Sequence, residues 1–114
     1  MKPIPKRLLI HTVMYQKETA SDFWRENVKV TDVQELKHVR MEASSKIVRD
    51  KNNAEIQLAA TLFYDCRNSK PKGIVFAIDD IIIFNGQKHC VKAMESLYDD
   101  KRLHHYEVGL VKYA

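Results

Sequence analysis

The chain has 114 residues and a formal net charge of +4 at pH 7, with 45% hydrophobic and 30% charged residues. This length predicts one domain, residues 1–114, and the composition is typical of a folded protein rather than a disordered chain. No apolar run approaches the ~20 residues of a membrane-spanning helix, so we expect no membrane partner. The apolar stretch 8–10 is too short for a secretory signal peptide.

The first seven residues form a proline-containing arm, because Pro3 and Pro5 cannot donate backbone hydrogen bonds. We expect this arm either to be disordered or to dock on a partner through Lys6 and Arg7. A strand is predicted for residues 8–15, which are rich in Leu, Ile, Thr, Val and Tyr.

Residues 17–27 are polar and predict a loop with at most one helical turn. This loop contains Phe23 and Trp24, which either cover one end of the fold or anchor an interface.

Residues 32–43 predict a long strand, because Val39 and Met41 alternate with polar residues. Residues 55–65 also alternate, and this favours one strand over the helix that their Ala, Leu and Gln content would allow. We predict a loop for residues 44–53. Its basic side chains either are solvated or contact a polyanion or a neighbouring subunit; they are Lys46, Arg49 and Lys51.

The last third of the chain predicts a β-meander. Asn85-Gly86 separates the apolar run 81–84 from the strand-like run 87–94, and this pair suits a two-residue type I′ turn. A further strand, 103–112, follows a turn at 98–101, and residues 67–73 carry turn signals before the meander. About six antiparallel strands without a long helix predict an all-β fold, a small antiparallel barrel or a compact sandwich.

No cluster of residues in the sequence predicts catalysis, a metal, a cofactor or a small-molecule substrate. Adjacent strand residues point to opposite faces, so His104 and His105 are not expected to share an ion, even with His89 and Cys90 nearby. Cys66 and Cys90 are expected to be reduced thiols, and no third group orients a Cys–His nucleophile. The acidic pairs 79–80 and 99–100 fit turns, and the three glycines form no phosphate-binding loop.

Four segments resemble a family of minor capsid proteins found in tailed bacteriophages and prophages of Gram-positive bacteria. These segments are residues 1–13, 62–71, 80–86 and 104–108. A broader pattern resembles the head-closure, or stopper, proteins of long-tailed phages. Its last motif corresponds here to Asp80, Ile82, Gly86, His89 and Val91.

The resemblance implies a non-enzymatic β-barrel subunit of the virion, made in the host bacterial cytoplasm. It would form a ring of six or twelve copies at the head–tail junction, between a portal or adaptor ring and the tail proteins. In stopper proteins the loop between the second and third strands tends to face the channel and helps to retain DNA. By position this loop is 44–53, which would place Lys46, Arg49 and Lys51 near DNA phosphates.

A second hypothesis is a single-stranded nucleic-acid-binding barrel of OB type, since a small basic barrel with exposed aromatic side chains would suit it. It predicts salt-sensitive binding of single strands by the isolated protein, whereas the connector hypothesis predicts little affinity.

Overall fold

Eight strands and one short 3-10 helix make up the computed structural model, which describes residues 3–17, 33–50 and 52–113. The helix η1 spans Lys6–Leu8. The strands are β1 (His11–Gln16), β2 (Val33–Ala43), β3 (Ile47–Arg49), β4 (Glu55–Gln57), β5 (Ala60–Asp65), β6 (Ile81–Phe84), β7 (Gln87–Tyr98) and β8 (Leu103–Lys112).

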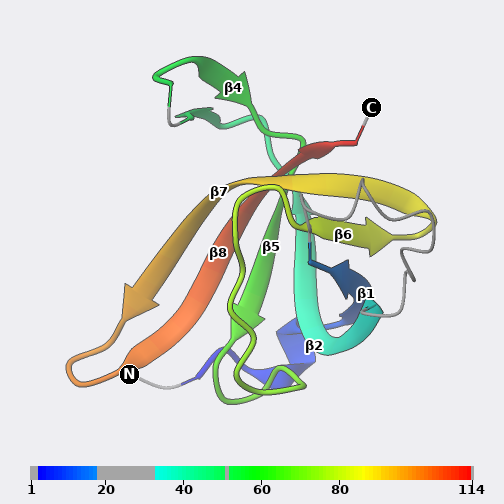
Figure 1. The fold of residues 1–114 in the computed structure, drawn as a ribbon. Coiled ribbons are helices and arrows are strands. Elements are labelled where there is room, and N and C mark those ends of the chain that lie inside the picture. The colour runs from blue at the N-terminus through cyan, green and yellow to red at the C-terminus, as the bar shows by residue number, and fades with distance from the viewer. Residues whose placement is uncertain (1–2, 18–32, 51, 114) are drawn as a thin grey trace.

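Six of these strands close an antiparallel barrel in the order β1-β2-β5-β8-β7-β6 (Figure 1). The all-β prediction is therefore confirmed, including the barrel of six strands and the C-terminal meander, and the described residues contain one short helix. The remaining strands, β3 and β4, form a separate two-stranded hairpin that projects above the barrel in Figure 1.

The turn between β6 and β7 has the predicted geometry. Asn85 and Gly86 both have positive φ, 51° and 75°, as a type I′ turn requires, and Phe84 pairs with Gln87 across it. The turn at 98–101 is also confirmed, since the Asp99 carboxylate accepts hydrogen bonds from the backbone N–H groups of Lys101 and Arg102.

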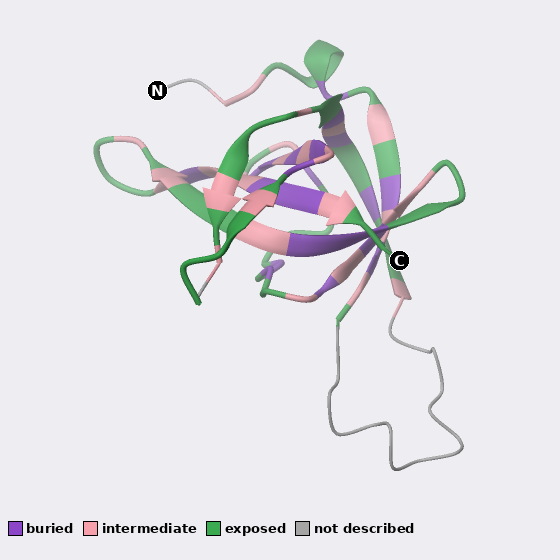
Figure 2. Cartoon of the chain, turned by 90° about the horizontal axis from the view of Figure 1, so that it is seen from above, coloured by how far each residue is buried: buried purple, intermediate pink, exposed green. Residues whose placement is uncertain are grey.

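The core lies inside the barrel, and every barrel strand contributes at least one buried residue to it (Figure 2). Phe76, from the segment between β5 and β6, is 1% exposed. Its ring centroid lies 5.2 Å from that of Tyr15 and 5.6 Å from those of Tyr64 and Tyr106, edge-on to each. Burial raises the pKa of Tyr64 to about 12, and its hydroxyl donates to the carbonyl of Pro71.

Three predicted elements need correction. The strand predicted at 8–15 begins only at His11, because residues 6–8 form η1, where the Leu9 N–H donates to the Lys6 carbonyl. The predicted loop 44–53 contains β3, whose β-branched Ile47 and Val48 pair with β4.

The single strand predicted at 55–65 is two strands, β4 and β5, because the chain changes partner between them. The Leu58 N–H donates to the Lys46 carbonyl of the hairpin, whereas the Ala59 N–H donates to the Leu110 carbonyl of β8. The Leu58 side chain then covers Gly109, where an added Cβ would lie 2.8 Å from Leu58 Cδ1. Because Gly109 has no side chain, Leu58 can pack against β8, and this contact links the base of the hairpin to the barrel.

Candidate assembly surfaces

The β3–β4 hairpin carries two of the three basic residues singled out in the sequence. Lys46 Nζ lies 3.2 Å from Glu95 Oε1 on β7, and Arg49 Nη2 lies 3.4 Å from Glu55 Oε1 on β4. All four side chains are more than half exposed, so each ion pair is worth at most about 1 kcal/mol and a phosphate could compete for the cation. Lys51 lies outside the described residues.

The hairpin buries little of its own surface. Every residue of β3 and β4 is exposed or intermediate, and the Ile47 side chain is 57% exposed. Residues 44–57 hold three basic and two acidic residues, so the hairpin is less basic than its loop alone indicates. It is attached to the barrel through Leu58 and the Lys46–Glu95 pair, and its end, at Arg49 and Asp50, faces residues 92–94 of β7 across a cavity. An element with so little buried area contributes little to the stability of its own subunit.

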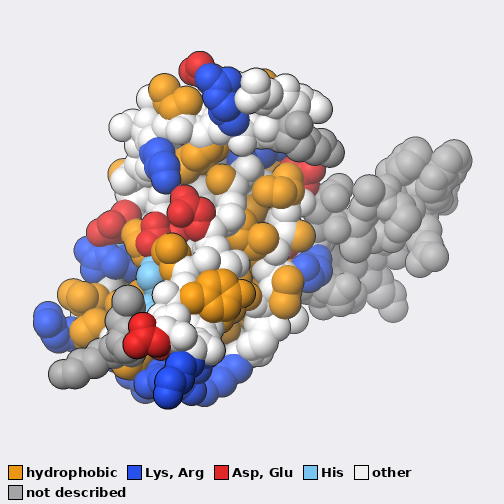
Figure 3. Space-filling view, turned by 90° about the vertical axis from the view of Figure 1, so that its left-hand side faces the viewer, with side chains coloured by type: hydrophobic (Ala, Val, Ile, Leu, Met, Phe, Trp, Pro, Cys, Tyr) orange, Lys and Arg blue, Asp and Glu red, His pale blue; other side chains and the backbone are white. Residues whose placement is uncertain are grey.

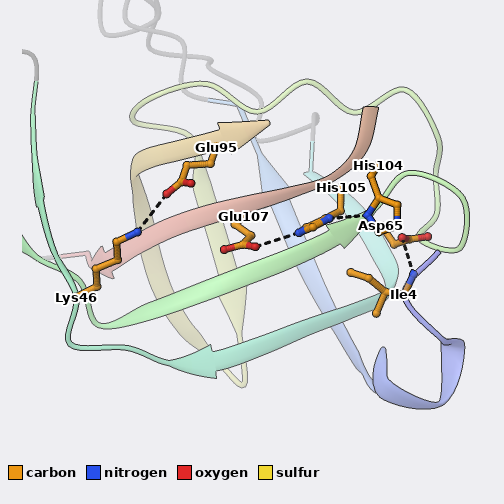
Figure 4. Close-up of polar contacts among 7 residues, drawn as sticks. All are labelled: Ile4, Lys46, Asp65, Glu95, His104, His105 and Glu107. Atoms are coloured by element: carbon orange, nitrogen blue, oxygen red, sulfur yellow. Dashed lines mark hydrogen bonds and ion pairs between the residues drawn. The ribbon is translucent and has the colours of Figure 1, made fainter. Parts of the chain in front are cut away.

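The N-terminal arm is held on the barrel by a polar clamp made of Asp65 and Asn68. Asp65 Oδ1 accepts the Ile4 N–H at 3.0 Å (Figure 4), and Asn68 Nδ2 donates to the Ile4 carbonyl at 2.7 Å. Asp65 is fully buried, and its other oxygen accepts the N–H groups of Arg67 and Asn68. The clamp therefore contacts only backbone atoms of Ile4.

A groove of about 410 Å³ lies where the arm crosses the outer face of β2, β5 and β8. Ile4, Leu8, Leu9 and Phe63 supply its apolar lining, and the polar lining is Arg40, Glu42 and His105. Arg40 Nη1 donates to the Leu8 carbonyl at 3.0 Å, and Leu9 is buried. The arm thus docks on its own barrel in this structure.

The predicted interface residues of the arm and of the polar loop have different outcomes. Lys6 and Arg7 lie in η1 and are exposed, so they are accessible to a partner. Phe23 and Trp24 lie outside the described residues, as does most of the loop predicted at 17–27. A contact by any of these four residues with another subunit stays a prediction.

A row of charged residues crosses the outer face of β7 and β8. Glu95 stands directly opposite Glu107, a like-charge pairing that costs stability unless each carboxylate has a cation partner. Lys46 approaches Glu95, and His105 Nε2 lies 3.0 Å from Glu107 Oε2 (Figure 4). The hairpin base and β8 thus each supply a group that offsets this repulsion.

The expected geometry of His104 and His105 is wrong, because their Nδ1 atoms lie 2.7 Å apart. One nitrogen must donate its proton to the other, so both cannot offer lone pairs to one ion while this contact holds. No group of three or more metal-ligating side chains occurs within the described residues.

Cys66 and Cys90 are both free thiols. Burial raises the pKa of the Cys66 thiol, which keeps it protonated at neutral pH and makes it a poor nucleophile. Among the described residues, no helix has the length and apolar character needed to cross a membrane.

A comparison with sequence models of protein families matches residues 5–110 to the minor capsid proteins. The chain belongs to the minor capsid protein family. No curated protein and no solved structure matches it. The family resemblance seen in the sequence is confirmed, and this minor capsid protein is a structural protein of the virion.

Sequence reasoning missed two features of the minor capsid protein. The clamp joins Ile4 to Asp65, which are 61 residues apart, and the segment 65–69 indicates only a turn. Phe76 follows Pro71 and Gly73, so it lies in a stretch that suggests a surface turn. The apolar run 74–78, with a large aromatic residue at its centre, could have predicted that this segment enters the core.

Proposed function

We propose that this minor capsid protein is a head-completion subunit of a tailed bacteriophage or prophage. In this proposal it forms a ring of six or twelve copies between the portal or adaptor ring and the tail, and helps to retain packaged DNA. The observation that carries the proposal is the projecting β3–β4 hairpin, which pairs with no barrel strand and buries almost nothing in its own subunit. Such an element fits contacts with other molecules in an assembly.

Contact with DNA would use the exposed cations of the hairpin. Lys46 and Arg49 sit in weak, exposed ion pairs, so each could exchange its carboxylate for a DNA phosphate at small cost. One subunit would contribute few contacts, but a ring repeats each contact several times around the channel. This arrangement fits weak binding by the free subunit and stronger binding by the assembled ring.

The OB-type alternative is not favoured. Binding of single strands needs exposed aromatic rings on which bases stack. Here Tyr15, Tyr64 and Phe76 face the core, and the exposed aromatic side chains among the described residues are Tyr98 and Tyr113, near strand ends. The family match also points to a capsid role.

Imaging of virions from the source phage or prophage tests the proposal. Cryo-electron microscopy, with a tag on the C-terminus of the minor capsid protein, is expected to show one ring at the head–tail junction. Absence from mature particles, or a distribution over the whole head shell, would overturn the proposed role.

DNA retention is tested separately with the double variant Lys46→Gln/Arg49→Gln. We expect normal numbers of tailed particles but a lower fraction that keeps DNA after mild heating, measured by nuclease sensitivity. The matched control is Lys88→Gln/Lys112→Gln, which removes two exposed cations of the barrel. Equal retention by both double variants would contradict a DNA contact by the hairpin. A gel-shift series across salt concentrations with the free protein tests the OB-type alternative.

A further inference from the structure

Within the part of the chain that the structure describes, the second half of β7 is an open sheet edge. The first half pairs with β6 as far as Cys90, and Val91 exchanges two backbone hydrogen bonds with Asp79 and Asp80. Beyond Lys92, β7 pairs only with β8 among the described residues. Open edges offer unpaired N–H and C=O groups to an incoming strand, and proteins usually cover or blunt them.

The hydrogen bonds of β8 show which β7 residues direct their backbone groups outward. The carbonyls of Leu110 and His104 accept N–H groups on the β5 side, so even-numbered residues of β8 between them face β5. The odd-numbered Glu107 and His105 therefore face β7, where they pair with Glu95 and Leu97. Met94 and Ser96 are left with N–H and C=O groups that point away from β8.

The same reasoning applies to β3 in the hairpin. The Lys46 carbonyl accepts the Leu58 N–H, and the Asp50 N–H donates to the Ala54 carbonyl, so even-numbered residues of β3 face β4. Ile47 and Arg49 thus direct their backbone groups outward. Each edge therefore has two residues, at positions i and i+2, whose N–H and C=O groups both point outward. Two such edges can form two hydrogen-bonded antiparallel pairs, with four hydrogen bonds in total.

We propose that β3 of one subunit adds to the open edge of β7 in the next copy of this chain, with Ser96 opposite Ile47 and Met94 opposite Arg49. Exposed apolar side chains stand on both edges, Met94 at 37% and Ile47 at 57%. Figure 3, which views the side of the molecule where β7 lies, shows hydrophobic side chains interrupted by acidic ones, with Lys and Arg above and below. The acidic residues among the apolar ones suit a strand that carries both apolar and basic side chains.

Charge distinguishes β3 from the two other edges that could fill this place. Pairing of β7 with β7 of another copy about a two-fold axis at Glu95, which uses the outward groups of both Met94 and Ser96, would place Glu95 opposite Glu95. The edge of β4 would bring Glu55 to the same acidic strand. The β3 edge instead brings Lys46, which precedes Ile47 and lies diagonal to Glu95 on the same face in this register, so it is the complementary choice.

The two edges are different parts of one subunit, so the contact is heterologous and extends from copy to copy until it closes. The inference therefore rests on the proposed ring and assigns its subunit contact. Strand addition uses backbone groups at the edge and leaves the faces of the hairpin free for other contacts.

Two proline variants test the contact. Ser96→Pro and Ile47→Pro each remove an N–H that points out of its own sheet, so the fold is expected to survive, as checked by thermal unfolding. Each variant should enter particles at least about tenfold less than the wild type, measured by immunoblotting of purified particles. The matched controls, Ser96→Thr and Ile47→Val, keep the N–H and should enter normally.

Cross-linking provides a readout that does not depend on the proline variants folding. Single-cysteine variants Ser96→Cys and Ile47→Cys, both in a Cys66→Ser/Cys90→Ala background, are co-expressed with the other structural genes, and purified particles are oxidised. We expect disulfide-linked dimers only when both variants are present. Opposed residues of an antiparallel pair lie close enough for this bond.

The outcomes separate this contact from the proposed function. Dimers formed by a Glu95→Cys variant alone, in the same background, would show two-fold pairing of β7 and overturn the assignment of β3. Normal entry of folded Ser96→Pro, with no mixed dimers in particles that contain a junction ring, would overturn the strand addition and leave the proposed ring standing. Absence of the wild-type protein from particles would instead remove the ring and the contact together.

Discussion

The wall of the barrel at β5 and β8 differs from the hairpin and the free end of β7 in how each strand is paired. Both β5 and β8 have a partner on each side, and their inward residues Leu62, Val108 and Leu110 are fully buried. β3 is paired on one side, and the second half of β7 is paired only with β8 among the described residues. The closed wall stabilises the subunit, and the open edges leave backbone groups available to other chains.

The largest effect is expected inside the closed wall, at Phe76. Phe76→Ala removes a buried ring that contacts three tyrosines, and the cavity should lower the free energy of unfolding by about 3–5 kcal/mol. Chemical denaturation followed by fluorescence measures this change. The control is Val75→Ala at the exposed neighbouring position, which should change stability by less than about 0.5 kcal/mol. Equal effects would mean that Phe76 does not belong to the core.

Asp65 connects the closed wall to the N-terminal arm, and its loss should be the next largest effect. Asp65→Ala leaves the N–H groups of Ile4, Arg67 and Asn68 without their acceptor, which should cost about 2–3 kcal/mol. It should also speed tryptic cleavage after Lys6 and Arg7, which an arm released from the clamp would expose. Asp100→Ala, at an exposed turn position, serves as the control. Unchanged cleavage would mean that the clamp does not hold the arm.

Gly109 lies where the hairpin joins the wall, and a methyl group there should have a smaller effect. Gly109→Ala would place a Cβ 2.8 Å from Leu58 Cδ1 and 3.1 Å from Ala93 Cβ. Because the Leu58 side chain can move, we expect a cost of about 1–2 kcal/mol in thermal or chemical unfolding. In the double variant Gly109→Ala/Leu58→Ala the new methyl group no longer meets Leu58, so the loss of stability should be smaller than the sum of the two single losses. Strictly additive losses would contradict the contact between Leu58 and Gly109.

The closed wall was also the part that the sequence predicted best. Asn85-Gly86 between two apolar runs favours one local structure, a type I′ turn. The alternation of apolar and polar residues in 32–43 and 103–112 indicates strands with one buried face. The break at Leu58 could not be predicted, because alternation continues through the change of partner from β3 to β8. The clamp on Ile4 depends on closure of the whole barrel, which no local pattern contains.

The candidate surfaces were located by position but not in detail. The three basic residues of the loop 44–53 were evident, whereas Glu95 and Glu55, which neutralise Lys46 and Arg49, lie on other strands. Ion-pair partners across a sheet depend on register, and the register of β3 with β4 was not visible because β3 itself was predicted as loop. The sequence therefore overestimated the free positive charge of the hairpin.

The smallest effect is expected in the open region, between Lys46 and Glu95. A double-mutant cycle with Lys46→Ala and Glu95→Ala should give a coupling below about 1 kcal/mol, because both side chains are more than half exposed, and high salt should reduce it further. The pair Arg49–Glu55, confined to the hairpin, is the matched comparison. A coupling well above this range would mean that the hairpin is fixed to the barrel as firmly as the wall strands are to each other. A small coupling would mean that Glu95 can exchange Lys46 of its own chain for a basic residue of a neighbouring copy at little cost, as addition of a strand at β7 requires.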